Sequence, residues 1–463
     1  MINATKSISR HLNEVLLELE KLKLRVSFLE KENLELREEN QRLKAMFDTN
    51  SSNSSKPPST DGFVKIFNSR EPTDRKPGGQ HGHKGRFRDL FGNPDEIIEY
   101  KHKTCECGHE IEYKKYVAKQ FVDVEIKVNL TEHRGYIGKC PLCKKKYNNS
   151  LPSHLINTVT YSDNVKALAI LLSAEGCVAV DRMNRILREI SCEKLKVSNG
   201  TIINWQNEFA KQTSDELANY KKELLESRVL HKDETSIDVG KELHWLHVLS
   251  NQKTTLYHAD AKRGHAADKV MGVLPLYKNV LVHDHLASLV NLPLCEHQEC
   301  NAHILRYLKG AKELRKRKFA ESMIELLVKA HRETLVSGQK KSLPSERISY
   351  YEKEYDRILD AGLKESLHHK EDSPLITRMK EYRDWHLLFL SRAEVPFDNN
   401  LAERDLRMIK TKAKVSGHFR SRQGSETFAA TKSILSTARK RGENLFQKIK
   451  SFYTSPVPIL NGV

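Results

Sequence analysis

The feature that most constrains the fold is a series of acids that end short apolar segments between residues 229 and 403. The first apolar run, 229–232, leads into Asp233. Segments 243–249 and 254–258 follow on either side of a polar turn, which predicts a hairpin. After a predicted helix at about 266–273, a second apolar strand at 279–283 ends on Asp284. The series therefore predicts two acids carried by strands.

A third acid lies far downstream. Asp398 or Asn399 can begin a helix, and Glu403 then falls in its early turns. This order of elements resembles a ribonuclease-H-like core, so we predict an α/β catalytic domain over 226–450, with a charged helical insertion at about 301–395. Three such carboxylates can hold two divalent ions about 3.5–4 Å apart and activate water or a 3′ hydroxyl toward a phosphodiester.

Neighbouring acids compete for two of these roles, because the chain contains 61 Asp and Glu residues. Glu234 competes with Asp233, Asp238 lies close by, and Asp398 competes with Glu403. Asp398 is followed by two asparagines and is better explained as a helix cap, which favours Glu403. We therefore predict Asp233, Asp284 and Glu403 as the catalytic acids and as ligands of Mg²⁺ or Mn²⁺.

The run 297–303 contains Cys300-x-x-His303, which by spacing could be half of a metal site. No second ligand pair is evident, so helix packing or substrate positioning is the favoured interpretation. The role of Cys300 and His303 stays open at this point.

The charge of the chain predicts a polyanionic partner. Its 463 residues, enough for about three domains, carry a net charge of +17, and residues 404–450 alone hold thirteen Lys or Arg and three acids. DNA contacts are therefore predicted at four basic residues behind the third acid: Lys412, Lys414, Arg420 and Arg422. No apolar run of membrane-spanning length and no secretion signal is evident, so we expect a cytoplasmic, nucleoid-associated protein without a membrane partner.

Residues 1–48 carry a heptad pattern. Val15, Leu22, Leu29, Leu36 and Leu43 are spaced by seven, and a second series three residues ahead ends on Asn33 and Asn40. Apolar d positions with asparagine at a are typical of parallel dimeric coiled coils. We predict a homodimer, or a higher oligomer, formed by this segment.

The next segment, 49–95, is a Ser/Asn/Pro linker followed by a basic, Gly-rich arm. It lacks the strand that precedes a phosphate-binding loop, so its glycines indicate no nucleotide site. An arm that lies along a DNA backbone is one interpretation and a plain linker is the other. The DNA-binding interpretation assigns contacts to Lys76, Lys84 and Arg86.

Four of the eight cysteines fall into two pairs in region 96–155, around a β-like span at 121–130. Cys105 and Cys107 form the first pair, and Cys140 and Cys143 form the second. Four thiolates in a tetrahedral array can bind structural Zn²⁺. The first pair is one residue shorter than the usual spacing, and His102 or His109 could replace one of its cysteines.

Region 156–225 is predicted to be helical. Segments 180–190 and 197–205 resemble a helix-turn-helix, with Ser198 as the N-cap of its second helix. That helix would offer Asn199 and Asn204 to a DNA groove, although a helical bundle without DNA contacts fits the pattern equally well. Residues 451–463 form a C-terminal tail.

Together these motifs resemble the large-subunit transposases of the insertion sequence 66 family. The match includes the zipper, the Ser-Ser-Lys-Pro-Pro-Ser linker at 54–59, the arm at 76–85, the cysteine pairs, Asp284 followed by the Cys300 motif, and Asp398-Asn399-Asn400-x-x-Glu403-Arg404. The resemblance implies a DDE transposase that binds terminal inverted repeats and joins 3′ ends to target DNA. It also implies accessory proteins from the same element. The alternative is a catalytically inactive DNA-binding regulator, which is disfavoured because no acid is missing.

Overall fold

The computed structural model describes residues 2–54, 82, 88–155, 157–336, 339–366 and 372–453. The chain divides into two compact units. The large unit comprises Met1–Ile66, Asn157–Met183 and Ser198–Val463, and the small unit comprises Phe67–Ile156 and Asn184–Val197. In the described residues no helix is both long enough and apolar enough to cross a membrane.

The N-terminal segment is one long helix, α1 (Ile2–Phe47). The leucines predicted at the coiled-coil seam are about half exposed on this single chain, from 48% for Leu43 to 62% for Leu22. The helix ends in a compact Asn/Ser turn, in which Asn50 and Asn53 accept or donate hydrogen bonds within 48–54. The seam is therefore available to a partner.

A five-stranded mixed sheet forms the centre of the large unit, in the order β5-β4-β3-β6-β7. The first three strands along the chain pair antiparallel, whereas β3, β6 and β7 are parallel. Gly240 and Lys241 adopt positive φ in the turn between β3 and β4, as tight hairpin turns require. The bounds are β3 (Val229–Val239), β4 (Glu242–Ser250), β5 (Thr255–Asp260), β6 (Val280–His283) and β7 (Glu296–Glu299).

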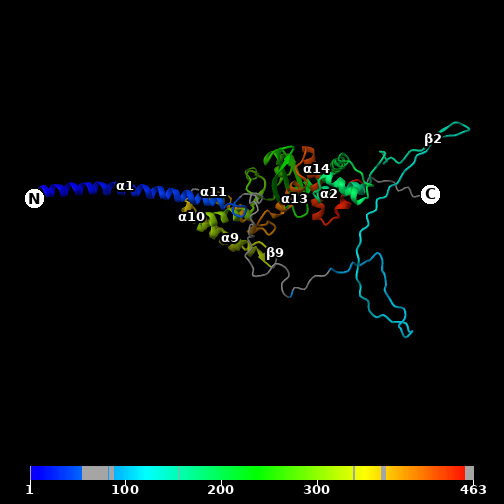
Figure 1. Ribbon diagram of the computed structural model, residues 1–463, viewed down its shortest axis with the longest axis horizontal. Coiled ribbons are helices and arrows are strands. Elements are labelled where there is room, and N and C mark those ends of the chain that lie inside the picture. The colour runs from blue at the N-terminus through cyan, green and yellow to red at the C-terminus, as the bar shows by residue number, and fades with distance from the viewer. Residues whose placement is uncertain are drawn as a thin grey trace. The chain divides into compact units, whose positions relative to one another are not determined.

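Helices cover both faces of the sheet. On one face, α13 (Asn400–Ser416) and α14 (Arg422–Lys440) pack on β3, β4 and β5 through Leu406, Phe428 and Val248. They lie beside the green strands in Figure 1. On the other face, α5 (Ser214–Leu225), α6 (His265–Met271), the turn η2 (Leu274–Leu276) and α7 (Ala287–Val290) bury the core around Leu230 and Leu281. The predicted α/β class with a mixed sheet is confirmed.

The predicted helix-turn-helix-like region does not stand apart from this core. Helix α4 (Asn199–Gln212) starts with Ser198 as its N-cap, as predicted, and buries Ile202, Trp205 and Phe209. It shares a core with α2 (Asp163–Ala174), α14 and α15 (Leu445–Ser451). The boundary between the two units falls within α3 (Val180–Ile190), whose ends match the predicted ones.

The predicted helical insertion is present between β7 and α13. Its members are α8 (Asn301–Arg315), α9 (Lys318–Thr334), the short strands β8 (Leu335–Val336) and β9 (Gln339–Lys340), α10 (Ser345–Ser366), α11 (Ser373–Glu381) and α12 (Arg383–Ser391). They enclose a core of their own that includes Met323, Tyr355 and Leu390. Helices α9, α10 and α11 form a group in Figure 1.

The small unit contains little regular structure. Strands β1 (Ile137–Lys139) and β2 (Lys146–Asn148) form a hairpin whose turn carries Cys140 and Cys143. The β-like span predicted at 121–130 is wrong, because these residues pair with no strand in the described chain. Their side chains are largely exposed, so β propensity has no neighbouring sheet to act on.

Candidate active site

The register of the parallel strands places the first two acids side by side. Lys232 of β3 pairs with His283 of β6, and Asp233 and Asp284 are the next residues on each chain segment. Asp233 was predicted at a strand end, but β3 continues to Val239 and places it mid-strand. The parallel pairing nevertheless stops just before it, because β6 ends at His283. Both acids therefore lie at the same edge of the sheet, where the parallel pairing of β3 and β6 stops.

Asn399 brings the third acid to this edge. It is fully buried and serves as the N-cap residue of α13, whose first turn contains Glu403. Its side-chain amide donates to the carbonyl oxygen of Lys232 at 2.7 Å, and its Oδ1 lies 2.9 Å from His231 Nδ1. Its backbone N–H donates to Cys300 Sγ at 3.2 Å. One asparagine thus joins β3, the start of α8 and the start of α13.

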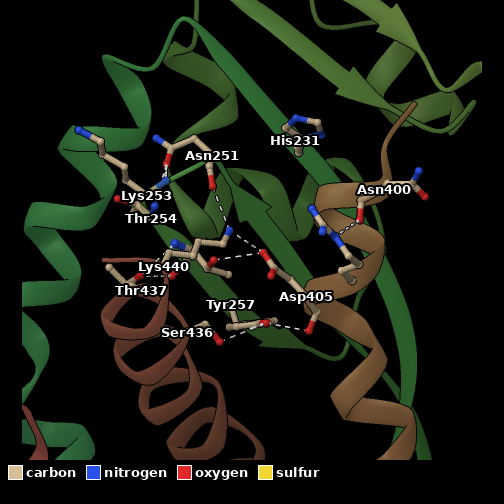
Figure 2. Close-up of polar contacts among 12 residues, drawn as sticks. His231, Asn251, Lys253, Thr254, Tyr257, Asn400, Asp405, Ser436, Thr437 and Lys440 are labelled. Carbon is tan, nitrogen blue, oxygen red and sulfur yellow. Dashed lines mark hydrogen bonds and ion pairs between the residues drawn. The ribbon is translucent and has the colours of Figure 1, made fainter. Parts of the chain in front are cut away.

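The opposite side of α13 is fixed by Asp405. Two residues correspond to about 200° around a helix, so Asp405 and Glu403 face in nearly opposite directions. Figure 2 shows Asp405 accepting a hydrogen bond from Lys440 of α14 at 2.8 Å, while Tyr257 donates to its carbonyl oxygen at 2.8 Å. The Thr255 hydroxyl of β5 also donates to its carboxylate at 3.1 Å. These bonds set the rotation of α13 and hence the direction of Glu403.

Cys300 and His303 join the acid cluster. The donor atoms of Asp284, Cys300, His303 and Glu403 all lie within 4.8 Å of one another. His303 Nδ1 is 3.1 Å from Asp284 Oδ1 and 4.0 Å from Glu403 Oε1. The motif left open by the sequence therefore lies at the site, because α8 starts where β7 ends.

Burial and neighbouring negative charge perturb Asp233 and Glu403. Burial, together with the negative charges of Asp284 and Glu403, raises the pKa of Asp233 to about 7. Burial also raises the pKa of Glu403, against the opposing charge of His303. Burial alone would lower the pKa of His303, but its hydrogen bonds to Asp284 and Cys300 prevail and raise it to about 11. His303 is thus a cation in contact with these acids.

The competing acids have other partners. Glu234 lies 3.0 Å from His247 and 3.4 Å from the buried ammonium of Lys232, and it also pairs with Arg263. Although burial opposes it, these contacts lower the pKa of Glu234 to about 2. Asp238 is exposed and lies 2.9 Å from His418. Asp398 precedes the N-cap Asn399 and accepts from the backbone N–H of Asn400 at 3.1 Å, so the cap position expected for Asp398 belongs to Asn399 instead.

The donor set fits a hard divalent cation. Carboxylate oxygens are preferred by Mg²⁺ and Mn²⁺, and a cation would neutralise the repulsion that raises the pKa of Asp233. Asp233, Asp284 and Glu403 would hold it. The thiol of Cys300 is fully buried and accepts from Asn399, so it serves to join α8 to α13.

The two cysteine pairs lie on similar turns of the small unit. In the second pair, Cys140 N–H donates to Lys145, Lys144 N–H donates to Cys140, and Lys144 has a positive φ. In the first pair, the Cys105 N–H donates to His109 and the Gly108 N–H to Cys105, and Gly108 has a positive φ. The first turn repeats the second with one residue fewer. Within the described residues the four thiols do not gather into one cluster.

The predicted DNA-contacting residues are placed differently from one another. Asn199 and Asn204 are exposed on α4, and Lys414, Arg420 and Arg422 are also exposed. Lys412 instead turns inward, with its ammonium 4.0 Å from the centre of the Phe419 ring. It is therefore poorly placed for a phosphate contact. Lys76, Lys84 and Arg86 lie outside the described residues.

Sequence reasoning missed three residues around the acids: Glu299, Arg378 and His285. Glu299 is fully buried at the end of β7, and His285, Arg378 and His386 converge on it. A carboxylate at the end of a third parallel strand was the available signal. No sequence signal pointed to Arg378, because this residue comes from the insertion.

Two family models match the chain. The model of the Transposase IS66 family matches residues 159–427, more than half of the chain and including all three acids. The model of a family of unknown function matches residues 3–89. No curated protein matches.

Proposed function

Since this chain belongs to the Transposase IS66 family, we propose that it binds the terminal inverted repeats of an insertion sequence and catalyses metal-dependent DNA cleavage and strand transfer. The observation that supports this proposal is the proximity of the predicted acids. Asp233 and Asp284 follow paired positions of β3 and β6, and the donor atoms of Asp284 and Glu403 lie within 4.8 Å of one another. The strand order, with three antiparallel strands followed by two strands that run parallel to the first, supports a ribonuclease-H-like core.

In this mechanism the three carboxylates would hold two Mg²⁺ or Mn²⁺ ions, which polarise the phosphodiester and lower the pKa of the attacking water or 3′ hydroxyl. His303 orients Asp284 and Glu403 through its contacts at 3.1 and 4.0 Å. The charge of Arg306 opposes the rise in the pKa of Glu403, and Arg306 would face the phosphate. Asn399 and Asp405 keep α13 from turning while the charge of the site changes.

DNA affinity would come from surfaces outside the acids. The exposed cations Lys414, Arg420 and Arg422, with Asn199 and Asn204 on α4, support contacts with the repeats and with target DNA. The cysteine turns support a zinc-binding module, and the exposed seam of α1 supports a homodimer. Accessory proteins of the same element and a cytoplasmic, nucleoid-associated location belong to the same proposal.

Strand transfer in vitro, with labelled terminal-repeat DNA and Mg²⁺ or Mn²⁺, tests the function. We expect Asp233→Ala, Asp284→Ala and Glu403→Ala each to lower the cleavage rate by about a thousandfold or more, because metal-assisted charge stabilisation contributes several kcal/mol. Binding of the repeat should stay near the wild-type level, since phosphate contacts lie elsewhere.

Asp238→Ala is the matched control, because it removes an exposed carboxylate from the same strand. It should cleave like the wild type. Near-normal cleavage by one of the three variants would remove that residue from the site. Repeat binding without any cleavage by the wild type would instead support the inactive regulator.

A further inference from the structure

A groove lies beside the acids, along one face of α11. It has a volume of about 540 Å³ and is lined by Ser373, Pro374, Thr377, Arg378, Glu381 and Tyr382, together with His285. The α11 residues recur at the spacing of one helix face. His285 comes from the other side, because it directly follows Asp284. The helical insertion and the loop that carries the second acid thus form the groove together.

A buried carboxylate holds the groove in place. Glu299 is inaccessible to solvent, and its Oε2 lies 3.3 Å from His285 Nδ1 and 3.0 Å from His386 Nε2. The guanidinium of Arg378 pairs with its other oxygen. A buried charge is stable only when it is paired and hydrogen-bonded, so Glu299 fixes both His285 and Arg378. His285 and Arg378, which line two sides of the groove, are therefore held in position without a ligand.

Arg378 connects the groove electrostatically with the acids. Burial lowers the pKa of its guanidinium to about 10, and the negative charge of Asp284 acts against this shift. The guanidinium also lies over the ring of Tyr307 on α8, 5.4 Å from its centre. Arg378 therefore presents a positive charge close to the edge of the site where a phosphate would meet Asp284.

The other end of the groove is aromatic. The rings of His285 and Tyr382 meet edge to face with their centres 5.1 Å apart, and Trp385 supports Tyr382 from 4.6 Å. The Tyr382 hydroxyl donates to Glu381 at 2.7 Å. Such a rigid aromatic surface can stack a nucleobase.

We propose that this groove binds one unstacked nucleotide of the DNA strand next to the phosphate held by the acids. Its base would stack on Tyr382 beside His285, and its phosphate would contact Arg378. The inference rests on the proposed function and adds a binding subsite to it. It makes the helical insertion part of the DNA-binding surface, because six of the seven lining residues lie on α11 or are Tyr382, the residue between α11 and α12.

Fluorescence of 2-aminopurine tests the proposal, because this base brightens when it leaves the stack. The probe is a duplex of the terminal repeat, with 2-aminopurine placed in turn at each nucleotide around the cleavage position, and with Ca²⁺ in place of Mg²⁺ to slow cleavage while the site keeps a divalent cation. The full-length wild type should brighten the probe at one flanking position. Tyr382→Ala should lose this fluorescence signal and cleave about tenfold more slowly than the wild type. Tyr382→Phe should keep the signal and the wild-type cleavage rate.

Tyr350→Ala is the control, because Tyr350 is a 40% exposed tyrosine of the same insertion that does not line the groove. It should behave like the wild type, and thermal melting of each variant should show that the fold is retained. On a duplex that is abasic at the responding position, Tyr382→Ala should cleave as fast as the wild type, since no base remains to be stacked.

The outcomes separate the two proposals. A wild type that cleaves the repeat without any bright position, or a folded Tyr382→Ala that cleaves normally, overturns the nucleotide groove and leaves the transposase function intact. A slow Tyr382→Ala on the abasic duplex also overturns it, because the defect would then not concern the base. A wild type that neither binds nor cleaves the repeat overturns both.

Discussion

Single side chains determine whether the three acids meet. Asn399 uses its amide and its Oδ1 on β3 and its backbone N–H on the start of α8, and it has no solvent exposure. Removing such a residue leaves buried groups without partners, and each such group costs about 1–3 kcal/mol. The position of Glu403 therefore depends on a residue that carries no charge.

Asn399→Ala should lower the free energy of unfolding by about 1–3 kcal/mol in urea titrations, because the carbonyl of Lys232 and His231 lose their partner. It should also reduce cleavage at a temperature where the variant is folded. Asn400→Ala, which removes an exposed neighbour bonded only to Asp398, should change neither. An unchanged stability of Asn399→Ala would refute the bridging role.

The raised pKa of Asp233 predicts a pH-dependent stability. Its pKa rises from 3.8 to about 7, so between these values the folded state binds more protons than the unfolded state. The metal-free protein should therefore lose stability as the pH rises through this window. The loss is at most about 4 kcal/mol, since one pKa unit corresponds to about 1.4 kcal/mol.

Asp233→Asn cannot ionise, so without metal it should be more stable than the wild type above pH 7 and equal to it near pH 4. Added Mn²⁺ should reverse this order at pH 8, because only the wild type has the third carboxylate. Thermal melting at the two pH values, with EDTA or Mn²⁺, measures both effects. Parallel pH profiles for the two proteins would count against the clustering of the acids.

At the scale of elements, sequence patterns located most helices and strands of the large unit. The hairpin, the strand before Asp284, the N-cap at Ser198 and both ends of α3 follow from periodicity and local hydrogen-bonding chemistry. The sequence patterns did not predict that β3 continues past Asp233, because the strand pairs first with β6 and then only with β4. The groove on α11 could not be found, since it depends on the contact between Arg378 and Glu299, which lie 79 positions apart.

The two cysteine turns are elements that we expect to bind one metal ion together. Both turns have the backbone bonds and the positive φ that present two thiols on one side. We expect one Zn²⁺ per chain, bound by Cys105, Cys107, Cys140 and Cys143, with its binding free energy stabilising a unit that has little core of its own. Elemental analysis of the purified protein measures the stoichiometry.

Replacing Cys140 and Cys143 by serine should remove the metal and make residues 100–150 sensitive to protease, while the large unit keeps its melting temperature. Cys192→Ser is the control, since this exposed cysteine lies on neither turn. A full complement of zinc in the double variant would disprove the predicted ligand set.

At the scale of the whole molecule, transposition requires two element ends to be held together. Helix α1 supplies a seam with half-exposed leucines, and Asn33 and Asn40 favour a parallel dimer. Two chains joined there would raise the effective concentration of the second end, with the linker after the helix providing reach. Dimerisation and end pairing should thus be lost together.

Replacing Leu29 and Leu36 by asparagine should convert the dimer to a monomer in sedimentation experiments and abolish paired-end complexes, with single-end binding retained. Leu24 and Leu34 are more exposed than Leu29 and Leu36 and lie off the seam, so their replacement by asparagine is the control. Deleting residues 1–48 should act like the seam variant. A deletion protein that still pairs two ends would place dimerisation in the core or on the DNA.

The link between Cys300 and Asn399 also has a consequence for how the molecule folds. These residues are 99 positions apart, yet the insertion between them leaves and rejoins the sheet at one point. Closing such a loop in a disordered chain is entropically unfavourable, whereas an insertion folded around its own core already holds its two ends close. We therefore expect the insertion to fold first and the acids to meet last. A chain still being synthesised would have no cutting activity until residue 403 and its helix had emerged.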